Sequence, residues 1–136
     1  MILPEEIIER LCRLPEDLRA VESSSTLVLL SMASLVAKSG YLQAPAVLTR
    51  ERVAWLLHQH VYLVDDWLMW SGDQRWPSAW CFDEKVGNYG THFEVYFYPG
   101  GAKTKFDDRT TACAEYIVRV VPWLIENHAP WKPKTS

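Results

Sequence analysis

The sequence predicts one α+β domain over residues 1–136. An N-terminal helical layer is expected to pack with a small antiparallel sheet of about three strands and with a C-terminal helix. Three observations predict this class. Apolar residues recur at helical spacing through most of residues 1–72. Residues 78–106 show strand patterns separated by turns, as in a β-meander. Helical spacing then returns over residues 108–127, directly after an aspartate.

The first expected helix covers residues 4–14. Pro4 suits its first turn, and Pro15 is expected to end it because proline cannot donate a backbone hydrogen bond. The apolar face of this helix carries Leu3, Ile7, Leu11 and Leu14. Residues 16–22 are expected to add one short helical turn.

The segment 26–40 predicts a second helix, capped by the serine run Ser23–Ser25 and ended by Gly40. Its residues are apolar nearly all round, and a helix of that kind is buried in a globular protein. We therefore expect this helix to be the backbone of the core.

A long third helix is predicted over residues 50–72, with Thr49 as its N-cap and Gly72 at its end. Its apolar stripe follows alternating steps of three and four residues. The stripe consists of Val53, Leu56, His60, Leu63, Trp67 and Trp70. His60 is accordingly expected to be a core imidazole with one hydrogen-bond partner.

Two antiparallel strands are predicted over residues 78–86 and 91–98, joined by a turn, with a short third strand over residues 102–106. Alternation places Phe93, Val95 and Phe97 on one face of the second strand. His92, Glu94, Tyr96 and Tyr98 fall on the other face. Lys103 and Lys105 are expected to point outward and protect the sheet edge.

The last helix is expected to begin at the acidic pair Asp107 and Asp108, which offer an N-cap and complement the helix dipole. Its buried stripe comprises Cys113, Tyr116 or Ile117, Val120 and Leu124. Pro122 is expected to kink or restart the helix about four residues earlier, because its ring clashes with a preceding carbonyl group.

Composition bounds the function. The formal charge of −3 is mild and neither half of the chain is strongly basic, so nucleic-acid binding is not expected. A mildly acidic surface instead suits a basic protein partner. The three separated cysteines, Cys12, Cys81 and Cys113, predict reduced, packed thiols. No signal peptide or membrane span is recognised, so a soluble, cytoplasmic protein is expected.

No catalytic or metal-binding motif is recognised, and neither a cofactor nor a metal is expected. His58 and His60 point about 200° apart on a helix, so they do not ligate one ion together. In each of the carboxylate pairs Asp65–Asp66 and Asp83–Glu84, the two side chains are expected to point in different directions. Only one carboxylate of each pair can therefore face a given ligand. A Cys113 nucleophile with His92 as its base is the remaining catalytic candidate, but Cys113 falls on the buried stripe.

The segment 67–84 is rich in both tryptophan and acidic residues. Aromatic anchors ringed by acids are typical of a surface that binds a basic protein. The predicted partner-binding residues are Asp66, Trp70, Asp73, Trp76, Asp83 and Glu84. The alternative is that these tryptophans fill the space between the long helix and the sheet.

The C-terminal third, "GNYGTHFEVYFYPGG…KFDDRTTACAEYIVRVV", resembles small bacterial immunity proteins of polymorphic or contact-dependent toxin systems. Hairpin strands, an acidic turn and a helix of the form alanine–cysteine–alanine–acid–aromatic carry the resemblance. In this sequence that form consists of Ala112, Cys113, Ala114, Glu115 and Tyr116. The resemblance implies a non-enzymatic protein that blocks one cognate toxin, which in such systems is often a basic nuclease.

Toxin neutralisation is therefore the expected function, by steric and electrostatic occlusion. A secretion chaperone or adaptor for an effector protein is the first alternative, because such proteins are also small, acidic and α+β. A small enzyme that depends on Cys113 or on a carboxylate pair is the second alternative.

Overall fold

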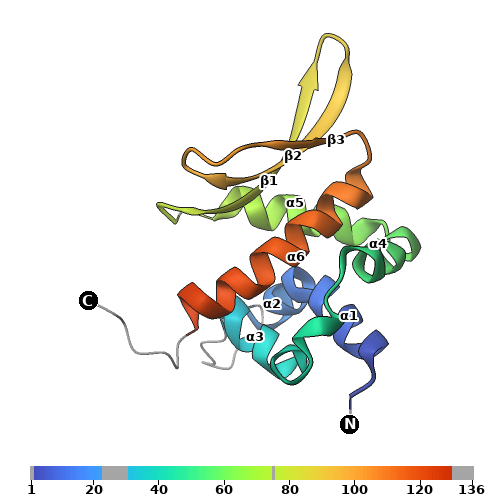
Figure 1. Cartoon of the computed structure of the whole chain (residues 1–136), viewed down its shortest axis with the longest axis vertical. Helices are drawn as coiled ribbons and strands as arrows, with labels where there is room; N and C mark the ends of the chain where they lie inside the picture. Colours follow the sequence, from blue (N-terminus) through green and yellow to red (C-terminus); the bar gives the residue numbers. More distant parts are fainter. Residues whose placement is uncertain (1, 23–30, 75, 130–136) are drawn as a thin grey trace.

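The described part of the chain holds six α-helices and a three-stranded antiparallel sheet, so the predicted α+β class is confirmed (Figure 1). Figure 1 shows a computed structural model that describes residues 2–22, 31–74 and 76–129, without the side chains of residues 21 and 22. The elements in chain order are α1 Pro4–Cys12, α2 Leu14–Glu22, α3 Met32–Lys38, the 3₁₀ turns η1 Tyr41–Gln43 and η2 Pro45–Val47, α4 Arg50–Gln59, α5 Tyr62–Asp73, β1 Ala79–Gly87, β2 Gly90–Tyr98, β3 Thr104–Phe106 and α6 Arg109–His128.

α6 is the central element of the fold. It crosses the middle of the molecule, with the sheet and α5 on one side and α1 to α3 on the other (Figure 1). It contacts α1, α3, α4, α5 and all three strands. The expectation that residues 26–40 form the backbone of the core is therefore wrong. A 20-residue helix with one continuous buried stripe has the length to contact every layer, whereas α3 has seven residues.

The N-terminal region contains one more helix than expected. α1 ends at Cys12, and Pro15 lies in the first turn of α2, where its missing N–H has no helical partner to lose. Residues 16–22 thus continue a nine-residue helix and are more than the single turn predicted. Burial of Leu11 and Leu14 on either side of the break holds both helices against the core.

The predicted helix over residues 26–40 begins only at Met32 in the described chain. Ser31 has an extended backbone (φ −90°, ψ 164°), and its Oγ accepts a hydrogen bond of 3.1 Å from the Ser34 N–H. Ser31 is therefore the N-cap, and a continuous helix through it is wrong. The proposed cap at Ser23–Ser25 lies outside the described residues. Gly40 follows the helix with φ 96°, as expected of a glycine stop.

The long helix predicted over residues 50–72 is two helices, α4 and α5. The break falls at His60, whose backbone is non-helical (φ −134°, ψ 64°). His60 is consequently a partly exposed residue in edge contact with the Tyr62 ring, and the expected core imidazole is wrong. Thr49 caps α4 as predicted, through a hydrogen bond from the Arg52 N–H to Thr49 Oγ1. α5 runs one residue past Gly72.

The sheet has the order β1–β2–β3, and its register places Phe82 opposite Val95 and Phe93 opposite Phe106. Side chains directly opposite one another share a face, so the inner face is apolar and rests on α5 and α6. The Phe82 N–H donates a 2.9 Å hydrogen bond to Ser71 Oγ, which ties the outer edge of β1 to α5. β3 is shorter than the strand predicted over residues 102–106.

α6 begins as predicted at Asp108, whose carboxylate accepts a 2.8 Å hydrogen bond from the Thr111 N–H. The predicted stripe of the helix is buried. The restart offered for Pro122 is wrong, because α6 continues to His128, whereas the kink offered as the other outcome stays a prediction. Proline removes one backbone donor, and the burial of Val121 and Leu124 around it holds the remaining turns in place.

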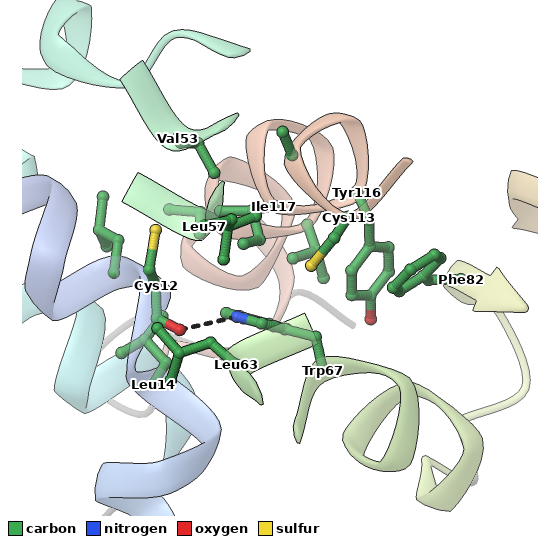
Figure 2. Packing of buried hydrophobic residues seen from close by; sticks show 14 of the residues in the cluster. Cys12, Leu14, Val53, Leu57, Leu63, Trp67, Phe82, Cys113, Tyr116 and Ile117 are labelled. Atoms are coloured by element: carbon green, nitrogen blue, oxygen red, sulfur yellow. Dashed lines mark hydrogen bonds between the residues drawn. The ribbon is translucent and has the colours of Figure 1, made fainter. Parts of the chain in front are cut away.

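One cluster of buried side chains joins the helices to the sheet (Figure 2). Trp67 lies at its centre and donates a 2.8 Å hydrogen bond from Nε1 to the Cys12 carbonyl oxygen, which links α5 to α1. The Tyr116 ring stacks on Phe82 with centroids 5.7 Å apart, which links α6 to β1. Among the described residues, no helix has the length and apolarity that crossing a membrane requires.

Candidate functional site

A surface pocket of about 370 Å³ lies where α2, α3 and α5 meet the segment before β1. Four of the six predicted partner-binding residues line it. They are Asp66, Trp70, Asp73 and Trp76. The first three share one face of α5, because they are spaced by four and three residues. The remaining lining residues are Pro15, Leu18, Arg19, Ser31, Met32, Met69 and Gln74.

Asp66 occupies one end of the pocket and is already paired. Arg19 Nη2 lies 2.8 Å from Asp66 Oδ1, which joins α2 to α5. The Asp66 side chain is 16% exposed, whereas that of Arg19 is 48% exposed. Asp66 therefore has a structural role in addition to its place in the pocket wall, and its charge is partly neutralised.

Asp73 is the second acid of the pocket. It lies at the end of α5, is exposed, and has no ion pair with any residue in the described ranges. An acid at the C-terminal end of a helix is disfavoured by the helix dipole. Asp73 therefore contributes little to the stability of α5, and its carboxylate is open to a partner.

Trp70 and Trp76 form the aromatic wall of the pocket. Their ring centroids are 6.1 Å apart in an edge-to-face arrangement. Trp70 is 9% exposed and also contacts the rings of Trp67 and Tyr116 in the core. The two interpretations offered for these tryptophans are therefore compatible, since Trp70 fills the space beside α6 and its edge lines the pocket.

Trp76 packs against the C-terminal part of α6. Its ring stacks on the His128 ring, with centroids 3.9 Å apart and an interplanar angle of 19°, and meets Trp123 edge to face. Burial lowers the pKa of His128, so its imidazole is neutral at physiological pH. A neutral ring packed against two indoles fixes the orientation of Trp76 before any partner binds.

Asp83 and Glu84, the other two predicted residues, lie on β1 and do not line the pocket. Asp83 lies on the outer face of the sheet, where it accepts a hydrogen bond from the Tyr96 hydroxyl group. Glu84 is exposed and lies opposite the buried Phe93, and the exposed half of the β1–β2 hairpin follows it. That half projects beyond the body of the molecule (Figure 1).

The outer face of the sheet carries a network that the sequence reasoning missed. Glu94 is 6% exposed although it points away from the core. His92 Nε2 lies 3.1 Å from Glu94 Oε2, and Lys103 Nζ lies 3.5 Å from Glu94 Oε1. The hydrogen bond with His92, followed in effect by the charge of Lys103, lowers the pKa of Glu94. Strand alternation indicated this face, but it did not indicate that Glu94 is buried between partners on β2 and on the segment before β3.

The catalytic candidates are not assembled in the described chain. Cys113 is fully buried, and burial raises the pKa of its thiol well above the ordinary value. Burial raises the pKa of Cys12 to about 12. His92 pairs with Glu94, which makes it a surface group of the sheet. No group of three potential metal ligands occurs among the described residues.

A second pocket, of about 420 Å³, lies between α1 and α4. Trp55 forms one of its walls and is 62% exposed. The sequence reasoning assigned Trp55 no role. Its position two residues after Val53, off the apolar stripe of α4, was the available signal, because such a position faces away from the core.

The structure is thus a small α+β chain with a surface pocket that is lined by two tryptophans and two aspartates, Trp70, Trp76, Asp66 and Asp73. Comparison of the chain with protein-family models, with curated proteins and with solved structures finds no match.

Proposed function

We propose that this chain is a non-enzymatic protein-binding module: an immunity protein that neutralises a cognate protein toxin by occluding it. The observation that carries the proposal is the pocket in which Asp73 lies beside Trp70 and Trp76. An exposed carboxylate that has no ion pair among the described residues and lies next to an aromatic wall suits the side chain of a lysine or arginine presented by another protein.

The proposed contact has three parts. The carboxylate of Asp73 pairs with the basic group of the toxin as the interface desolvates both. The exposed surface of Trp76 and the edge of Trp70 receive the aliphatic stem of that side chain. Arg19, already held by Asp66, sets the size of the opening on the α2 side.

Two further features support toxin occlusion as the use of this pocket. The C-terminal third resembles immunity proteins, as described above. The chain carries a formal charge of −3, which favours a basic partner such as a nuclease whose substrate cleft is positive. The interface is then complementary in charge, and the bound immunity protein excludes the substrate.

The test uses this chain and the product of the gene beside it. The two are expressed together and separately, complex formation is measured by size-exclusion chromatography and calorimetry, and growth is recorded in each case. We expect the neighbouring product to arrest growth alone and to be bound and silenced by this chain.

Asp73→Lys is the informative variant, because Asp73 has no structural partner among the described residues. It is expected to weaken the complex by several kcal/mol, since it places like charges at the interface. Glu126→Lys is the matched control, because it makes the same charge change at an exposed position of α6 outside the pocket. Equal affinity of the two variants would show that the pocket is not the contact.

A non-toxic neighbour that this chain binds and keeps in solution would instead identify an adaptor or chaperone. That result would contradict toxin neutralisation while leaving the pocket as a contact site.

A further inference from the structure

We infer that the groove between α1 and α4 is a second binding site, which takes a large apolar side chain flanked by basic residues on a protein segment. This site is independent of the toxin-binding proposal, because the two pockets share no residue. This α1–α4 groove is lined by Pro4, Glu5, Ile8, Glu51, Arg52, Trp55 and Leu56.

The floor of the α1–α4 groove is apolar and fixed. Ile8 of α1 and Leu56 of α4 are 3% and 8% exposed, so both are anchored in the core and present only their outer atoms to the groove. Pro4, in the first turn of α1, also lines the groove. A volume of about 420 Å³ admits one large side chain, with room for the backbone that carries it.

Trp55 is the feature that a purely structural role does not explain. Its side chain is 62% exposed, and its indole N–H has no hydrogen-bond acceptor among the described residues. Tryptophan is the residue type most enriched where interface energy concentrates, because it offers a large apolar surface with one directional donor. A bound segment would cover the ring and accept from its N–H.

The charge at the rim specifies the flanking residues. Glu5 and Glu51 line the groove and have no ion pair within the described ranges. The dipoles of α1 and α4 favour acids in these first turns, but the carboxylates keep their hydrogen-bonding capacity for a ligand. Arg52 donates to the Val47 carbonyl oxygen at 3.1 Å, which orients its guanidinium group but leaves its charge, so the lining has two carboxylates against one guanidinium and is net negative. The groove thus presents two acids to an arriving segment.

A second copy of this chain is a poor occupant by the same argument. A two-fold axis through the α1–α4 groove would bring its net negative lining against the same lining of the other protomer. Like charges at the centre of an interface oppose association. A basic heterologous segment removes that repulsion.

The full-length chain labelled with 5-fluorotryptophan gives a direct test by fluorine NMR. The Trp55 signal is assigned with Trp55→Phe, and the Trp70 and Trp76 signals, assigned in the same way, report on the other pocket. The first probe is the peptide acetyl-KRLFRK-amide. The two comparison probes are acetyl-KRSSRK-amide, which lacks the apolar pair, and acetyl-EELFEE-amide, which reverses the charges.

We expect acetyl-KRLFRK-amide to shift the Trp55 signal in a saturable manner, and neither comparison probe to do so at the same concentration. With a fluorescein-labelled copy of the first peptide, Trp55→Ala is expected to weaken binding by about tenfold or more. The double variant Glu5→Gln/Glu51→Gln is expected to weaken it by about threefold at low salt and to reduce the salt dependence. Tyr89→Ala, which removes another exposed aromatic ring, is the control that retains binding.

Four results would overturn the inference. The first is that the Trp55 signal does not saturate with the first probe. The second is that only the Trp70 and Trp76 signals move. The third is an equal response to acetyl-KRSSRK-amide, which would leave charge attraction without an apolar site. The fourth is self-association in sedimentation equilibrium that Trp55→Ala abolishes, which would assign the groove to a second copy.

Discussion

Trp67 and Trp55 show how the same side chain serves opposite purposes in one small protein. Trp67 is fully buried, contacts the rings of Trp70 and Tyr116, and donates its N–H to the Cys12 carbonyl oxygen (Figure 2). Trp55, twelve residues earlier, is 62% exposed beside an apolar groove and makes no such bond within the described chain. Tryptophan content alone therefore indicates neither a core nor an interface.

The difference is one of position on the helix. Trp67 follows Leu63 by four residues on the buried face of α5, whereas Trp55 follows the buried Val53 by only two on α4. Two residues correspond to a rotation of about 200° about the helix axis. Stability is therefore expected to depend on Trp67, and recognition on Trp55.

The largest expected effect is that of Trp67→Ala. Removing a buried indole leaves a cavity and an unpaired Cys12 carbonyl oxygen, and such substitutions lower the free energy of unfolding by about 3–5 kcal/mol. Urea denaturation followed by circular dichroism measures the loss. Trp67→Phe, which keeps a ring and removes the hydrogen bond, is expected to fall between the wild type and Trp67→Ala. A loss below about 1 kcal/mol for Trp67→Ala would contradict the central role of this residue.

The second effect concerns Ser71, the polar link between α5 and β1. In Ser71→Ala the buried Phe82 N–H loses its acceptor, and an unsatisfied buried donor costs about 1–3 kcal/mol. The free energy of unfolding in urea gives the cost. Ser78→Ala, at an exposed serine just before β1, is the matched control and is expected to be near neutral. Equal effects of the two substitutions would argue against the link.

The sequence predicts the fold class because local patterns dominate it. Strand alternation and the Asp108 cap gave β2 and the start of α6 within a residue. The break at His60 could not be predicted from helix-breaking residues, because neither glycine nor proline lies at this position. The unbroken course of α6 through Pro122 was missed because tertiary burial outweighs one lost backbone hydrogen bond.

The candidate site divides in the same way. Asp66, Trp70 and Asp73 were brought together because helix spacing alone places them on one face. Asp83 and Glu84 do not line the pocket, because they lie on β1 and are part of the sheet. The α1–α4 groove was not predicted, because it forms where two helices far apart in the sequence pack together. No local pattern in the sequence indicates that pairing.

The third effect is a pH dependence from Asp108, the N-cap of α6. The hydrogen bond from the Thr111 side chain has the largest effect and lowers the pKa of the Asp108 carboxyl group below the usual 3.8. The hydrogen bond from the Thr111 backbone N–H lowers this pKa further. A lowered pKa in the folded state means that the ionised cap contributes stability above the unfolded value. That contribution is lost as the pH falls below about 4 through the folded pKa.

Asp108→Asn keeps a capping side chain but removes the titration, so it is the matched variant for this test. Asp108→Ala removes both and is expected to cost about 1 kcal/mol at neutral pH. Urea denaturation from pH 7 down to pH 2.5 is the measurement. The difference between wild type and Asp108→Asn is expected to shrink toward low pH, and a constant difference would contradict the role of the charge.

The smallest expected effect on stability is that of Trp55→Ala, and it distinguishes the roles of Trp55 and Trp67 most directly. An exposed side chain without an internal hydrogen bond contributes little to folding, so the free energy of unfolding is expected to change by about 0.5 kcal/mol or less. Ile8 and Leu56 beneath it stay buried in either case. The same urea titration used for Trp67→Ala gives the value under identical conditions.

A loss comparable to that of Trp67→Ala would mean that Trp55 covers the core and is structural. A near-zero change would show that the ring contributes nothing to folding, as the proposed role in the α1–α4 groove requires.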